Sequence, residues 1–109
     1  MTVEDFLIKS GFKAVSMPNP SKEIQGAYVG DLLSWVMGRA EPGNVWVTIM
    51  SNVNVLAVAS LADISCVVLA EGTSLDEDAL ATANVKGINV LSTDLASYET
   101  ALKISEILK

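Results

Sequence analysis

The chain has 109 residues, of which 50% are hydrophobic and 18% are charged, and this composition predicts one globular domain over residues 1–109. The formal net charge is −6 and the seven basic residues are scattered, so we expect no binding to nucleic acid or to an anionic membrane surface, both of which require clustered cations. The sequence has no histidine and one cysteine, which excludes histidine-based acid–base catalysis, Ser–His or Cys–His nucleophiles and an ordinary zinc site.

Residues 2–10 are predicted to form a helix that begins with a capping pair. Thr2 is followed three residues later by Asp5, a spacing at which each side chain can bond to the other residue's backbone N–H. Gly11 is expected to end this helix. Residues 12–17 then suit a short strand, which the two prolines of "PNPSKE" interrupt.

From residue 26 onwards, short hydrophobic strands alternate with helices. We expect Asp31 to cap the first of these helices, and Ser74 with Glu77 to form a capping box at the third. Strands that alternate with helices form parallel sheets, so the sequence predicts an α/β fold, a compact layered domain with a mostly parallel sheet flanked by helices. The predicted strands cover residues 26–30, 45–50, 65–70 and 88–91, and the helices that follow them cover residues 32–40, 53–63, 75–87 and 95–109.

The helix predicted over residues 53–63 has almost no polar face. A helix that is apolar all round must be buried on all sides, and a domain of 109 residues has little depth in which to bury one. We therefore expect its outer face to pack against a second copy of the chain in a two-fold symmetric homodimer. The apolar residues of this helix are Val53, Val55, Leu56, Ala57, Val58, Ala59, Leu61 and Ala62.

No hydrophobic run approaches the roughly 20 residues that a membrane-spanning helix needs, so no membrane span is expected. The first residues, "MTVEDF", contain acidic side chains and no basic segment, and we therefore expect no secretory signal and a cytoplasmic location. Cys66 lies in the apolar run "ISCVVLA" and is expected to be a buried, unreactive thiol.

Polar residues follow each of the strands predicted from residue 26 onwards. In open parallel sheets, ligands bind beyond the carboxyl ends of the strands, so these residues would lie along the ligand-facing edge. The pattern assigns no catalytic residue, no metal site and no particular cofactor. The candidate ligand-binding residues are Asp31, Ser51, Asn52, Asn54, Glu71, Thr73, Ser92 and Thr93.

Two interpretations of these polar residues stay open. Ser, Thr, Asp and Asn are the preferred helix N-caps, and each turn precedes a helix, so capping alone can account for them. Alternatively, the helix N-termini face a pocket and attract an anion. The carboxylates of Asp31, Glu71 and Asp94 would repel a bare phosphate there unless Lys22, Arg39 or a metal ion offset their charge.

Three stretches carry a family resemblance: "GAYVGDLLSWVM", "WVTIMSNVNVLAVASLADISCVVLAEG" and "KGINVLSTDLASYETA". Together they resemble the DRTGG domain family over about residues 26–108. Members of this family are α/β modules that occur beside CBS domains in regulated pyrophosphatases, next to phosphotransacetylases, or alone. They are related in fold to the N-terminal domain of HPr kinase/phosphorylase. The resemblance implies a ligand-sensing or dimerising module rather than a catalyst.

The chain departs from this family at the signature that names it. The sequence Asp-Arg-Thr-Gly-Gly is missing, and "MSNVN" stands where the resemblance would place an acidic–basic turn after the third strand. The likeness is greater to stand-alone members without the signature, which occur in anaerobic bacteria near genes for iron hydrogenases and redox complexes. HPr kinase activity is not implied, because it resides in a separate phosphate-loop domain.

Three functional hypotheses follow. The first is a non-catalytic regulatory module, homodimeric, that senses a nucleotide or another small molecule at the strand ends. The second is an interaction or scaffold protein of an anaerobic redox or hydrogenase system, with a protein partner and no small-molecule ligand. The third is an enzyme that uses aspartate or glutamate with Mg²⁺ on a phosphorylated substrate. We expect the first and predict that the protein is not an enzyme.

Overall fold

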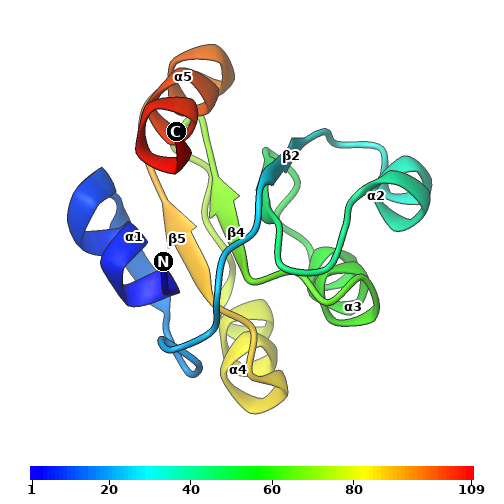
Figure 1. Cartoon of the computed structure of the whole chain (residues 1–109). Helices are drawn as coiled ribbons and strands as arrows, with labels where there is room; N and C mark the ends of the chain where they lie inside the picture. The colour runs from blue at the N-terminus through cyan, green and yellow to red at the C-terminus, as the bar shows by residue number, and fades with distance from the viewer.

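The computed structural model describes residues 1–109 as one sheet with helices on both of its faces (Figure 1). This arrangement confirms the predicted α/β class. The strands are β1 (Lys13–Ser16), β2 (Ala27–Val29), β3 (Val45–Thr48), β4 (Cys66–Leu69) and β5 (Val90–Ser92). The helices are α1 (Val3–Ser10), α2 (Leu33–Arg39), α3 (Val53–Leu61), α4 (Glu77–Lys86) and α5 (Ser97–Leu108).

The strand order across the sheet is β1-β5-β4-β3-β2. Neighbouring strands from β2 to β5 are parallel, whereas β1 runs antiparallel to β5, with Lys13 opposite Ser92. The sheet is therefore mostly parallel, as predicted. The carboxyl ends of β2, β3, β4 and β5 lie along one edge, and the first residue of β1 lies at that same edge.

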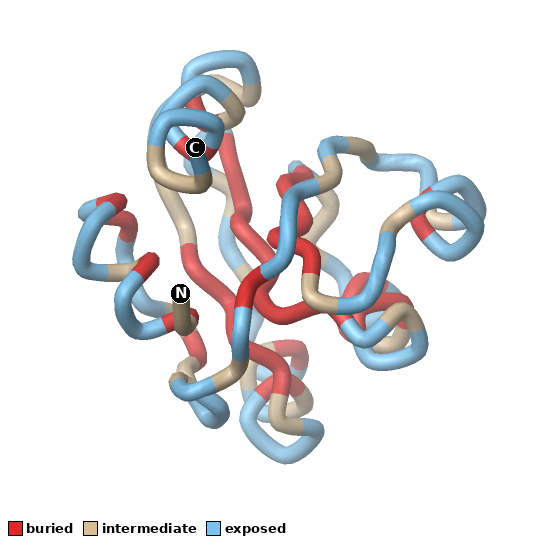
Figure 2. The backbone as a smooth tube through the Cα atoms, in the orientation of Figure 1, coloured by how far each residue is buried: buried red, intermediate tan, exposed pale blue.

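Two hydrophobic cores fill the spaces between the sheet and its helices. The core under α2, α3 and α4 contains Trp46, Val67 and Leu69, and the core under α1 and α5 contains Phe6 and Val68. Figure 2 shows buried backbone along the central strands and exposed backbone on the outer turns of the helices. Strands β3 and β4 are buried at every position, because they are covered on both faces, and this explains their uninterrupted hydrophobic sequences.

The helix ends agree with the sequence predictions at α1 and differ at α2 and α4. Thr2 and Asp5 form the expected capping box, and Gly11 ends α1 in a left-handed conformation with a φ of 70°. Asp31 does not cap α2, which begins after Leu32 without a side-chain cap. The predicted box of Ser74 and Glu77 is also wrong. Asp76 caps α4 instead, because its carboxylate accepts a hydrogen bond of 2.8 Å from the backbone N–H of Ala79.

Helix α3 carries no charged residue and is buried on one side only. Val55, Leu56 and Ala59 are fully buried against the sheet, whereas Val53 is 51% exposed and Leu61 is 74% exposed. As expected from the size of the domain, a single chain does not bury this helix on all sides, because α3 lies in an outer layer with nothing packed over it. Its outward face is uncharged and carries Val53 and Leu61 beside the polar residues Asn54 and Ser60.

None of the five helices combines the length and the hydrophobicity that crossing a membrane would require.

Cys66 is fully buried in β4, and the loss of solvation raises the pKa of its thiol from an ordinary value of 9.0 to about 12. As the pH rises, the Cys66 thiol loses its proton at a lower pH in the unfolded chain than in the folded one. The buried, protonated thiol therefore makes its full contribution to the stability of the fold below pH 9, and this contribution is lost as the pH rises towards 12.

We expect a disulfide reagent at pH 8 to leave Cys66 unmodified in the folded protein and to modify it fully in urea, because only the exposed thiolate reacts. Labelling followed by mass spectrometry would test this expectation. Rapid labelling of the folded protein would contradict it.

Candidate functional site

The predicted site residues lie on turns along the carboxyl edge of the sheet, where hydrogen bonds join neighbouring turns. At the β2–β3 end, Asp31 Oδ1 accepts hydrogen bonds from Thr48 Oγ1 at 2.8 Å and from the backbone N–H of Ile49 at 2.9 Å. The Asp31 carboxylate therefore holds the exit of β2 against the exit of β3. It links two turns instead of capping a helix.

The turns after β4 and β5 are joined in the same way. The backbone N–H of Glu71 donates to the Leu95 carbonyl at 2.8 Å, and that of Gly72 donates to the Thr93 carbonyl at 3.0 Å. Glu71 Oε2 also accepts from the backbone N–H of Ser97 at 2.9 Å, at the first turn of α5. This places a negative charge at a helix N-terminus, where the helix dipole stabilises it.

Three further predicted residues form local hydrogen bonds. Asn52 is the N-cap of α3, and its side chain accepts from the backbone N–H of Asn54 at 2.9 Å. Thr73 Oγ1 donates to the Ala70 carbonyl at 2.8 Å, and Thr93 Oγ1 accepts from the backbone N–H of Leu95 at 3.2 Å. These bonds support the capping and turn interpretation for these residues.

The remaining predicted side chains are those of Ser51, Asn54 and Ser92, which take no part in hydrogen bonds within the chain. Ser51 and Ser92 are half-buried and Asn54 is exposed. Ser51 and Asn54 lie near the start of α3, whereas Ser92 ends β5 at the other half of the edge. The edge thus consists of two groups of turns. The turns after β4 and β5 are joined to each other, and the turns after β2 and β3 are joined to each other.

A hollow of about 400 Å³ opens at the end of β5 and the start of β1, and we call it the β1–β5 hollow. It contains two of the predicted residues, Ser92 and Thr93. Three further lining residues at the start of β1, Gly11, Phe12 and Lys13, were not predicted, because the alternation of strands and helices gives no direction for β1. The one signal in the sequence was that no helix is predicted directly after that strand. The hollow is lined by Gly11, Phe12, Lys13, Ser92, Thr93, Asp94 and Leu95.

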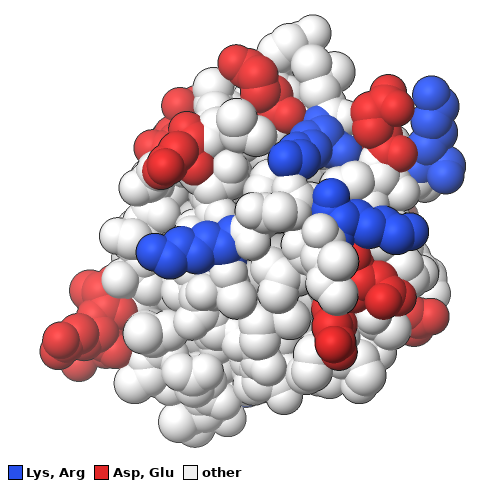
Figure 3. All heavy atoms as spheres, turned by 90° about the vertical axis from the view of Figure 1, so that its left-hand side faces the viewer, with Lys and Arg blue, Asp and Glu red and all other residues white.

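Both signs of charge border this hollow. Lys13 and Asp94 line it, and neither belongs to the ion pairs of the chain, which join Met1 to Glu23, Lys22 to Asp63, and Lys109 to Glu106. On the face that carries α1 and α5, basic and acidic side chains lie interspersed (Figure 3). The site is therefore mixed in charge and is no part of an extended basic surface.

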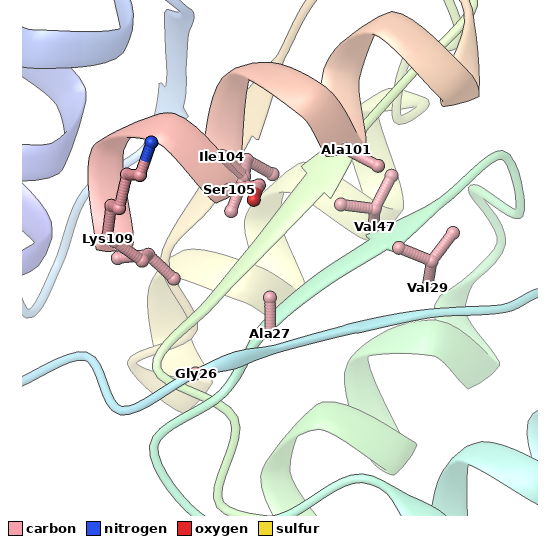
Figure 4. A pocket seen from close by; sticks show the side chains of 9 residues that line it. Gly26, Ala27, Val29, Val47, Ala101, Ile104, Ser105 and Lys109 are labelled. Atoms are coloured by element: carbon pink, nitrogen blue, oxygen red, sulfur yellow. The ribbon is translucent and has the colours of Figure 1, made fainter.

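A second cavity, of about 440 Å³, lies between β2 and α5 (Figure 4). Val29 and Val47 approach it from the sheet, and Ala101, Ile104 and Leu108 approach it from the helix. Its lining is mainly apolar, and none of the predicted site residues belongs to it. We call it the β2–α5 groove.

No group of three or more aspartate, glutamate, cysteine or histidine side chains is positioned to hold a metal ion.

The fold and the strand-end hollow define a three-layer α/β module with a small-molecule-sized cavity. The sequence matches the DRTGG domain family over residues 19–107, and the chain belongs to that family. Comparison with curated proteins finds no similar sequence.

A similar solved structure is the crystal structure of the CBS and DRTGG domains of the regulatory region of Clostridium perfringens pyrophosphatase, complexed with the activator diadenosine tetraphosphate. The superposition has a TM-score of 0.75 at 12% identity and covers 94% of this chain. It covers 45% of the pyrophosphatase chain, so the present chain spans less than half of that structure. At this identity the likeness establishes the shared fold.

Proposed function

We propose that the protein is a non-catalytic regulatory module that binds a small ligand, such as a nucleotide, at the carboxyl edge of its sheet. The observation that carries this proposal is the β1–β5 hollow, a cavity at the strand ends that contains Ser92 and Thr93. Ligands of open α/β sheets bind at this edge. Membership of the DRTGG family adds support, since the C. perfringens relative carries its DRTGG domain in a regulatory region.

The chemistry of the chain supports binding rather than catalysis. The chain has no histidine to activate a hydroxyl, and its one thiol, Cys66, is fully buried with a pKa raised to about 12 by desolvation. At neutral pH this thiol is protonated and out of reach of a substrate. An aspartate- or glutamate-based enzyme would need its carboxylates to converge, but Asp31 and Glu71 hold separate turns of the edge.

We expect at least one compound from a panel of nucleotides, acetyl phosphate and metal ions to raise the thermal unfolding temperature. A ligand at 100 times its dissociation constant stabilises the folded form by about 2.7 kcal/mol. Ser92→Ala should reduce the effect of an active compound, because it removes a hydroxyl from the hollow, and Ser21→Ala at an exposed position outside the helices and strands should not. A panel without any active compound, together with recovery of a redox protein as a specific partner, would contradict ligand sensing and favour the scaffold alternative.

We further propose that the module is a homodimer that forms through the outward face of α3. Val53, Ala57 and Leu61 recur at every fourth position on this face, and the helix carries no charge. Helix α2 packs beside α3 and adds Trp35, which is 52% exposed and whose ring lies 3.8 Å from the Arg39 guanidinium. An exposed apolar surface of this kind is typical of an interface, and a two-fold axis would bury it against itself.

Leu61→Lys is expected to convert the dimer to a monomer, because it places a charge in the interface at the end of α3. A lysine there also suits the helix dipole, so folding should be retained. Val85→Lys provides a matched control, since Val85 is 87% exposed on α4, outside the proposed interface. Light scattering at micromolar concentration would measure the mass of each variant. A monomeric parent protein, or a Leu61→Lys variant that remains dimeric, would be evidence against this interface.

A further inference from the structure

We propose that the β1–β5 hollow recognises a ligand that carries one anionic group together with hydroxyl or amine donors. This inference rests on the proposed ligand-binding function and specifies the ligand class and the position of the site. A nucleoside monophosphate and an α-amino acid share this chemistry.

The anionic group is matched by Lys13 at the start of β1. Its side chain is exposed, lines the hollow and forms no ion pair within the chain. In the sheet register Lys13 lies opposite Ser92, so an ammonium and a hydroxyl border the same space. A lysine ammonium beside hydroxyl groups is a common binding arrangement for phosphate or carboxylate oxygens.

A second cation lies near the hollow without lining it. Lys103 Nζ, on α5, is 5.5 Å from the centre of the ring of Phe12, which is a lining residue. This cation–π contact places a second positive charge near the hollow. It adds to the charge of Lys13 in a chain whose net charge is −6.

The opposite side of the hollow carries the carboxylate of Asp94. A Cβ atom on Gly72 would lie 3.3 Å from Asp94 Oδ1, which places this carboxylate against the turn that follows β4. Since β5 separates β4 from β1, the carboxylate and Lys13 lie on opposite sides of β5. A carboxylate accepts hydrogen bonds from hydroxyl or amine groups and repels a second anion. The hollow thus suits one anionic group at one end and donors at the other.

The size of the hollow agrees with such a ligand. Its volume of about 400 Å³ lies within the range of small-molecule sites, which is roughly 300–1,000 Å³. Phe12 and Leu95 give it an apolar wall between the charged ends.

Isothermal titration calorimetry of the whole chain with AMP, adenosine, inorganic phosphate and glutamine would test this inference. We expect AMP or glutamine to bind more tightly than adenosine or phosphate. Lys13→Gln should raise the dissociation constant by about 10- to 100-fold, the effect of losing a hydrogen bond to a charged group. Asp94→Asn should weaken the binding of AMP or glutamine and leave that of phosphate unchanged. Lys86→Gln, an exposed lysine on α4, is the control and should change nothing. Circular dichroism would confirm that each variant is folded.

Binding of AMP alone would identify the ligand as a nucleotide, and binding of glutamine alone would identify it as an amino acid. Either result supports the inference. Equal affinities for adenosine and AMP, an unchanged affinity in Lys13→Gln, or no binding by any of the four probes would overturn it. The proposed function is judged separately by the wider thermal panel. A compound that stabilises the protein equally in the parent and in Lys13→Gln would leave ligand sensing intact and refute this site.

Discussion

The parallel direction of β2, β3, β4 and β5 is the constraint on which the rest of the structure depends. Strands β2, β3 and β4 each continue into a helix, and that helix returns the chain to the edge where the next strand begins. The carboxyl ends of all four strands therefore lie at the same edge of the sheet. Hydrogen bonds carry the sheet pairing into the turns, from Ala70 N–H to the Thr48 carbonyl at 3.1 Å and from Thr93 N–H to the Leu69 carbonyl at 2.9 Å. The polar turn residues are therefore fixed to a rigid edge.

Most of these polar residues have structural roles that also shape the site. Asp31 joins the exits of β2 and β3, and Glu71 joins the turn after β4 to the start of α5. With these carboxylates occupied, Ser92, Lys13 and Asp94 are left without side-chain partners at the β1–β5 hollow. Under the proposed function, capping and ligand binding are divided between the residues of one edge. They are not mutually exclusive interpretations of it.

The fold could be predicted from the sequence because its signals are local. Uninterrupted hydrophobic runs such as that of β4 require cover on both faces, and the turns between them mark each crossover. The polar residues at the carboxyl edge could be predicted in the same way, because they follow the strands directly in the sequence. The cap of α4 was mispredicted because Ser74 and Asp76 are both good N-caps, and only the backbone geometry selects Asp76.

The site itself depended on information that is not local. Lys13 reaches the hollow because β1 pairs antiparallel with β5, and these strands are separated by most of the chain. The partnership of Asp31 with Thr48 likewise depends on the pairing of β2 with β3. What covers the outer face of α3 also lies beyond the local sequence, because the absence of charge does not show whether its own chain or another one packs on it.

The central claim, that ligand binds at the β1–β5 end of the carboxyl edge, is tested most directly by backbone-amide chemical-shift mapping of ¹⁵N-labelled protein titrated with AMP. The account predicts that the largest shifts will cluster at residues 11–13 and 92–95, which line the hollow. Shifts concentrated instead at residues 26–29 and 101–109, along the β2–α5 groove, would contradict it.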